Sequence, residues 1–165
     1  MRKTLIAAVA LVALVATAAA FAAVAAGGTH STAQQRVRID VSGTDPYTFA
    51  LTPRSKGRAK PDTGSMTFCC WRSWKVNRAG ASLEVTNPRL TLVGTQGTLT
   101  IRNQIEWVGL PDGWSWWTGT WKIIGGTGAY AGLSGHGLTA GTWEPDSSAP
   151  NQHIRIRLLG FLEPK

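Results

Sequence analysis

The sequence is poor in the residues that most often form metal sites. It contains two cysteines and three histidines among 165 residues, and no CxxC or HxxxH spacing occurs. This excludes the usual zinc-binding patterns. We expect neither a metal nor another cofactor.

The two cysteines, Cys69 and Cys70, are adjacent. Neighbouring Cα atoms lie only about 3.8 Å apart, below the usual span of a disulfide, so the pair cannot form an ordinary staple. A vicinal disulfide, a bridge to another chain and free thiols all stay open. A strand would point the two side chains to opposite faces, which favours two thiols with one of them buried.

Long apolar runs are also absent, except at the N-terminus. After two cationic residues, an uncharged, alanine-rich stretch extends from Leu5 to Ala26. A positive start, an apolar centre and small residues before a cleavage point are typical of a secretory signal. We expect residues 1–26 to be this signal, cleaved after Ala25 or Ala26, and the protein to be secreted or held in the extracellular envelope. An uncleaved anchor is the alternative, because a run of this length can span a bilayer. It would be the only contact with a membrane.

Acidic residues are few in the remainder of the chain. About 139 residues follow the signal, enough for one domain with a core, and they hold 15 basic against 9 acidic residues. We expect a flexible lead over residues 27–35 and a single domain over residues 36–165. The excess of positive charge favours anionic partners in general, and no specific nucleic-acid partner is expected.

The densest basic cluster has four cations at every second position. Glycine and proline among them predict an exposed loop. A solvated loop is the favoured interpretation, and a dedicated anion-binding site is the alternative. The four candidate anion-binding residues are Arg54, Lys56, Arg58 and Lys60.

Helical periodicity is absent from residue 27 onward, and apolar and polar residues alternate instead. This alternation is typical of half-buried strands, and it is interrupted by turn residues. Together with nineteen glycines, it predicts an all-β fold, an antiparallel up-and-down barrel of about eight strands that follows the signal helix. A two-sheet sandwich is the alternative. Strands are expected within 36–41, 47–51, 66–74, 83–85, 90–92, 97–108, 114–124, 137–143 and 154–158, of which 97–108 is the longest.

A glycine-rich motif follows one of these strands. Residues 121–135 read WKIIGGTGAYAGLSG, a strand entering a GG[ST]G turn with an aromatic residue before the next strand. This resembles the allene oxide cyclase and dirigent-protein barrels, and secreted bacterial proteins of that barrel class. The resemblance implies an eight-stranded up-and-down barrel with a central cavity, assembled as dimers or trimers. It transfers no functional residue, because those residues lie outside the glycine motif. The glycines themselves predict a corner between two strands.

Alternation along the expected strands identifies candidates for the lining of the interior. Asn103 shares a face with Ile101 and Ile105, where a buried amide either fixes a ligand or bonds a core water or backbone group, the latter being favoured. Glu106 takes the opposite phase and is expected on the outer surface. Trp114 and Trp116 are expected to be exposed near a turn. The candidate lining residues are Asn103, Ile101, Ile105, Trp107, Trp117, Trp121 and Phe68.

Patterns for catalysis are weak. Residues 126–131 match GxGxxA, but the glycines that follow would break the helix that a dinucleotide site needs. Ser134 and His136 do not form a GxSxG elbow. We therefore identify no catalytic residue and favour a secreted barrel that binds a small apolar or aromatic ligand without catalysis. An isomerase-, cyclase- or dirigent-like enzyme that uses the same cavity is the alternative, and a polyanion-binding envelope protein is a further one.

Overall fold

The computed structural model describes residues 34–78, 81–110, 113–145 and 153–165. The expected signal and most of the expected lead lie outside these residues. In the described part of the chain, no helix has the length and apolar character needed to cross a membrane. The described residues form ten strands and one 3-10 helix: β1 (Gln35–Gly43), β2 (Tyr47–Pro53), β3 (Asp62–Cys69), β4 (Ser73–Arg78), β5 (Ala81–Thr86), β6 (Arg89–Gly94), β7 (Gly97–Gly109), β8 (Ser115–Gly126), η1 (Gly128–Tyr130), β9 (Leu133–Glu144) and β10 (His153–Pro164).

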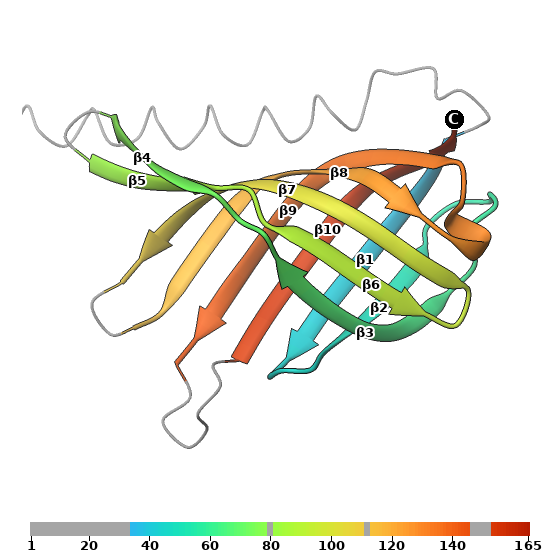
Figure 1. The fold of residues 1–165 in the computed structure, drawn as a ribbon, viewed down its shortest axis with the longest axis horizontal. Coiled ribbons are helices and arrows are strands. Elements are labelled where there is room, and N and C mark those ends of the chain that lie inside the picture. The colour runs from blue at the N-terminus through green and yellow to red at the C-terminus, as the bar shows by residue number, and fades with distance from the viewer. Residues whose placement is uncertain (1–33, 79–80, 111–112, 146–152) are drawn as a thin grey trace, which may run out of the picture. The chain divides into compact units, whose positions relative to one another are not determined.

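Eight of the strands form a closed antiparallel barrel (Figure 1). Around the ring they follow the order β1, β2, β3, β6, β7, β8, β9 and β10, and β10 pairs with β1 to complete it. The chain thus runs up and down around the barrel. The predicted all-β antiparallel barrel is confirmed, and the alternative two-sheet sandwich is wrong. The longest strand is β7, as the alternation predicted.

Strands β4 and β5 form a hairpin that continues β3 and β6 away from the ring (Figure 1). The prediction of one strand over residues 66–74 is wrong, because β3 ends at Cys69 and β4 begins at Ser73. Residues 70–72 connect β3 to β4, and only two residues, 87–88, lie opposite them between β5 and β6. One extra residue acts as a bulge and reverses the side that the following positions face.

Alternate residues of the barrel strands fill the interior. On β1, Val37, Ile39 and Val41 are almost completely buried. Trp121 of β8 is buried against the adjacent strands β9 and β10, and its Nε1 donates to the Leu159 carbonyl oxygen at 3.2 Å. A Cβ atom on Gly160 would lie 2.6 Å from Cζ2 of this ring, so a glycine is required beside it. The middle of the barrel is therefore packed with side chains.

One end of the barrel is sealed by the glycine-rich corner between β8 and β9. Gly128 and Gly132 have φ values of +58° and +69°, a region that glycine adopts readily, and this turn carries η1. The prediction of a corner between two strands is confirmed. Tyr130, 1% exposed, points from η1 into the core, where its hydroxyl donates to Oδ2 of Asp62 at 2.8 Å.

Asp62 is the centre of the hydrogen bonds at this end. Its Oδ1 accepts from the N–H of Thr63 at 2.9 Å, and from the N–H and hydroxyl of Thr95 at 2.9 and 2.7 Å. Burial alone would raise the pKa of Asp62, but the hydrogen bonds from Thr95, Tyr130 and Gln96 hold it below its ordinary value. Burial, together with the hydrogen bond to Asp62 and its charge, raises the pKa of Tyr130. The Asp62 carboxylate thus stays charged and the Tyr130 phenol stays protonated, which are the states that the hydrogen bond between them requires.

The β2–β3 loop also lies at the sealed end. Gln35, 3% exposed, begins β1 one residue before the expected start of the domain. Its side chain donates to the Ala59 carbonyl oxygen and accepts from the Ala59 N–H, both at 2.8 Å. Ala59 is thereby held in the core, while the four cations around it are exposed, as predicted for this loop.

We predict that Asp62→Asn lowers the free energy of unfolding at pH 7 by about 1–3 kcal/mol, because an amide cannot replace a carboxylate that accepts from several buried donors. The folded-state pKa of Asp62 lies below the unfolded value, so its contribution is complete above the unfolded pKa and is lost as pH falls through the folded pKa. In urea unfolding, the difference between wild type and variant should therefore shrink below about pH 4.

The matched control is Asp40→Asn on the outer wall. Asp40 contacts Arg38 and Arg157, both partly solvent-accessible, and the variant should lose at most about 1 kcal/mol. Equal losses in the two variants, or a loss at Asp62 that does not change with pH, would contradict the role given to this seal.

Candidate ligand cavity at the open end

The end of the barrel opposite η1 opens onto a cavity of about 300 Å³. Most of the barrel strands that end or begin there contribute to its wall, and so does the first part of the β4–β5 hairpin. The wall is mainly aromatic and aliphatic, with a few polar side chains. The lining residues are Phe68, Trp71, Ser73, Glu84, Thr86, Pro88, Leu90, Asn103, Ile105, Trp107, Trp117, Trp143, Ile154 and Ile156.

Five of the seven predicted lining residues meet in this wall, namely Phe68, Asn103, Ile105, Trp107 and Trp117. The other two, Ile101 and Trp121, are not part of the lining. Ile101 and Trp121 are buried deeper, where Trp121 packs on the glycines of β9 and β10. Alternation identifies the face of a strand but not the depth at which packing fills the barrel.

Aromatic rings form two groups around the cavity. From β7, β8 and β9, Trp107 stacks on Trp117 with ring centroids 4.9 Å apart, and Trp143 meets Trp107 edge-on at 5.4 Å. From β2, β3 and the bulge, Phe68 stacks on Tyr47 at 5.1 Å and contacts Trp71 at 5.7 Å. Such rings offer flat apolar surfaces on which another ring can stack.

Two buried polar atoms of the wall lack partners within the described part of the chain. Asn103 is 1% exposed, and its Oδ1 has no hydrogen bond. The same holds for the indole Nε1 of Trp143. The backbone N–H of Asn103 is used, because it donates to the Pro88 carbonyl oxygen at 3.0 Å. Buried polar groups are normally paired, so these two atoms are unusual.

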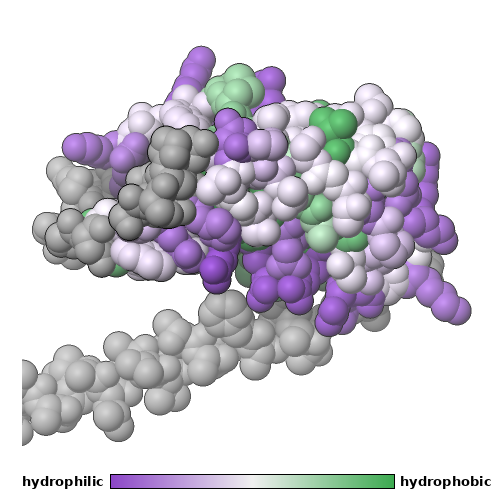
Figure 2. Space-filling view, turned by 90° about the horizontal axis from the view of Figure 1, so that it is seen from below, coloured by the Kyte–Doolittle hydropathy of each residue, from purple (hydrophilic) through white to green (hydrophobic). Residues whose placement is uncertain are grey.

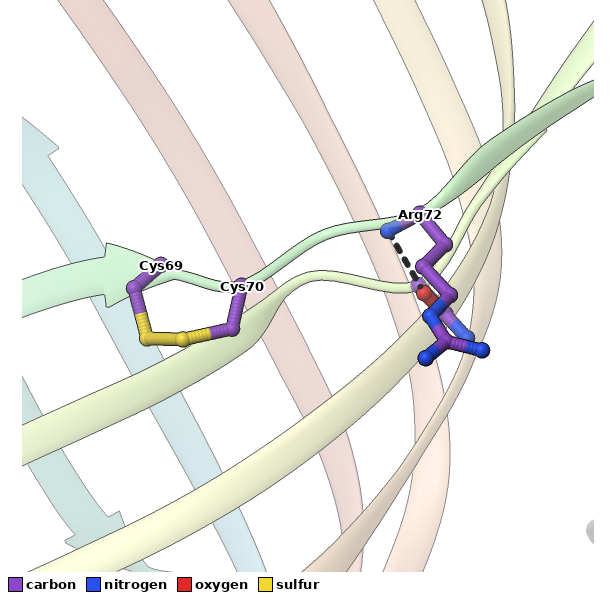
Figure 3. Close-up of a disulfide and its surroundings, with 4 residues drawn as sticks. Cys69, Cys70 and Arg72 are labelled. Atoms are coloured by element: carbon purple, nitrogen blue, oxygen red, sulfur yellow. Dashed lines mark hydrogen bonds between the residues drawn. A yellow bond between two sulfur atoms is a disulfide. The ribbon is translucent and has the colours of Figure 1, made fainter.

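The bulge between β3 and β4 brings Trp71 to the cavity. Cys69 and Cys70 form a vicinal disulfide, and Cys70 is the only described residue other than glycine with a positive φ, at +59° (Figure 3). The expectation of two thiols with one buried is wrong: the side chains are bonded and both residues are exposed, because the chain leaves the strand at Cys70.

Two hydrogen bonds join the end of this bulge nearest β4 to the segment between β5 and β6. The N–H of Arg72 donates to Oδ1 of Asn87 at 2.9 Å, the dashed line in Figure 3, and the N–H of Asn87 donates to the Arg72 carbonyl oxygen at 3.1 Å. Trp71 lies between the disulfide and these bonds. Its ring is therefore placed at the rim, 55% exposed, beside Phe68.

Most of the described carboxylates lie away from the cavity. Glu106 is exposed on the outer face of β7, as predicted. Asp40 lies on the outer wall and Asp62 at the sealed end. One described carboxylate, Glu84, belongs to the lining. The sequence did not predict this, because the apolar residues on either side of Glu84 were expected to face the core, and Glu84 itself would then face outward. Among the described residues, no cluster of three or more His, Cys, Asp or Glu could hold a metal ion.

Outside the cavity, the wall of the barrel is largely hydrophilic, with separate hydrophobic patches on the face shown in Figure 2. Trp114 and Trp116 are 40% and 45% exposed, as predicted. The basic loop belongs to the sealed end and adds nothing to the cavity. Its four cations and the candidate cavity therefore form separate features.

Some lining residues were not anticipated, among them Trp71, Trp143, Ile154 and Ile156. The alternation of the last strand would have placed Ile154 and Ile156 inside. Trp71 carried no such signal, because its position depends on the bulge.

Reduction of the disulfide by a small dithiol should leave the free energy of unfolding within about 1 kcal/mol, because a bond between neighbours closes a very short loop and removes little chain entropy. It should instead move Trp71. We expect its indole N–H signal, assigned by comparison with Trp71→Phe, to shift on reduction in ¹⁵N NMR spectra, while the signal of buried Trp121 stays in place. An unchanged Trp71 signal, or loss of the fold, would contradict this.

Comparison of the chain with protein-family models, with curated proteins and with solved structures finds no match.

Proposed function

We propose that this protein is exported and that its barrel binds a small apolar or aromatic ligand in the cavity at its open end, without catalysis. The observation that carries the proposal is the contrast between the two ends. At one end the Asp62–Tyr130 hydrogen bond closes the core, and the second pocket there, of about 400 Å³, is a more open one formed by the basic loop. The other end holds a cavity of about 300 Å³ walled by aromatic rings.

The size and lining of the cavity fit such a ligand. A volume of about 300 Å³ lies at the lower end of the range of small-molecule pockets. An eight-stranded barrel is just wide enough for its own side chains or one small ligand. The stacked pair Trp107 and Trp117 and the rim residue Trp71 offer ring faces on different sides, which favours a flat molecule.

An enzyme of the isomerase, cyclase or dirigent type is supported less well. Acid or base chemistry in an apolar cavity needs a carboxylate or an equivalent group beside the substrate. Of the seven described carboxylates, Glu106, Asp40 and Asp62 among them, only Glu84 lines the cavity. A polyanion-binding envelope protein is supported by the exposure of Arg54, Lys56, Arg58 and Lys60, and by the open pocket at this loop that Lys56 and Lys60 line.

Isothermal titration with naphthalene and 2-naphthol tests the proposal. We expect at least one of them to bind the purified protein at one site, and Ser73→Phe to weaken its binding by about tenfold or more, the equivalent of roughly 1.4 kcal/mol. Ser73 lines the rim of the cavity, so a phenyl group there would occupy the space of the ligand.

Ser65→Phe is the matched control, because Ser65 is exposed on the outer face of β3. It makes the same change in size and hydrophobicity and should bind as wild type does. Absence of binding by both compounds, or equal binding by the two variants when both are folded by circular dichroism, would refute a ligand site in this cavity.

A further inference from the structure

The unpartnered side-chain oxygen of Asn103 specifies the chemistry of the ligand beyond its shape. The residue is 99% buried, since only 1% of its surface is exposed, and it forms part of the cavity wall. An amide oxygen that is withdrawn from water without a partner is costly for the fold. A binding partner that donates a hydrogen bond would remove this cost.

None of the described residues donates a hydrogen bond to this oxygen. Ile101 and Ile105, its neighbours on the inner face of β7, are apolar. Trp121, its pair on β8, has the nearest indole by register, but that Nε1 donates to Leu159. The cavity that Asn103 lines is therefore the place from which a bound molecule could supply the donor.

The position of Asn103 along β7 explains why it opens to the cavity. β6 pairs with β7 as far as Arg102, and β5 resumes pairing at Ile105. The gap between them is spanned by Asn87 and Pro88, and Pro88 itself lines the cavity. The amide thus lies where the wall is interrupted, at the inner part of the cavity, with aromatic rings on the neighbouring strands.

We infer that the ligand is a flat aromatic compound that carries an O–H or N–H group, and that this group donates to Oδ1 of Asn103. Ring stacking against the tryptophans supplies most of the affinity, and Asn103 selects between rings of similar size. This inference rests on the proposed function, because it assigns a selective contact within the same cavity. Asn103 is a specificity-determining residue here, and no reaction is assigned to it.

The test compares two probes of similar size, 2-naphthol, which has a donor, and 2-fluoronaphthalene, which has none. Each is titrated into wild type and Asn103→Leu. The four affinities form a thermodynamic cycle, which isolates the interaction between the donor group of the probe and the amide of the protein. We expect the affinity for 2-naphthol to fall by about 3- to 10-fold in the variant, as for loss of one hydrogen bond. The affinity for 2-fluoronaphthalene should stay within about twofold or increase.

Gln104→Leu is the matched control. It removes an amide from the next residue of β7, which is exposed on the outer face, and should alter neither affinity. The side-chain ¹³C signal of Asn103 in wild type gives a readout that needs no variant, and it should shift with 2-naphthol more than with 2-fluoronaphthalene.

The outcomes separate the inference from the proposed function. The inference would be overturned if both probes bind, Asn103→Leu changes their affinities equally, and the Asn103 signal shifts equally with both. The cavity would then still be a ligand site, but its amide would bind water only. Failure of wild type to bind either probe would overturn the proposed function, and the inference with it. A selective loss for 2-naphthol together with the selective shift would establish the contact.

Discussion

Closure of the strand ladder is the constraint on which the rest of this structure depends. Once β10 pairs with β1 and β7 with β8, the barrel has no free edge among its eight strands, and its width is set by their number. The interior then has room for one layer of inward side chains. Trp121, set on glycines of the neighbouring strands, belongs to the buried core that fills it. The candidate cavity lies at one end of this core.

The connections between strands differ at the two ends of the barrel. At one end the connections are short or tied down, and the charged Asp62 holds Thr95 and Tyr130 together across three segments. At the other, the connection from β3 to β6 is drawn out into the β4–β5 hairpin, and an extra residue in the bulge releases Trp71 from the strand pattern. The same interruption lies beside Asn103, which is buried in the cavity wall. The cavity thus arises from a local break in an otherwise regular ladder.

Much of the barrel could be predicted from the sequence, because period-two alternation reports directly on which face of a strand is buried. This is why Asn103, Ile105, Trp107 and Trp117 could be assigned to inward faces, and all four lie in the cavity wall. The depth of a residue was not predictable in this way, and Trp121 shares the phase of Trp117 without reaching the cavity. Register across non-adjacent segments was not predictable either, so the pairing of residues 70–72 with residues 87–88 came only from the structure.

The vicinal cysteines show the limit most clearly. Alternation assumes a continuous strand and assigns Cys69 and Cys70 to opposite faces. The chain instead turns at Cys70 with a positive φ, and both sulfur atoms are joined outside the core. Similarly, no pattern marked Asp62 as the centre of the sealed end, because its partners are distant in sequence. Contacts of this kind depend on closure of the whole barrel.

A crystal structure of the protein grown with 2-naphthol would test most directly whether the open end is a ligand site. We expect the naphthalene ring to occupy the space between Trp71 and the Trp107–Trp117 pair, with its hydroxyl within hydrogen-bonding distance of Oδ1 of Asn103. A cavity filled by the protein's own side chains, or a ring bound only on the outer wall, would contradict a ligand site at this end of the barrel.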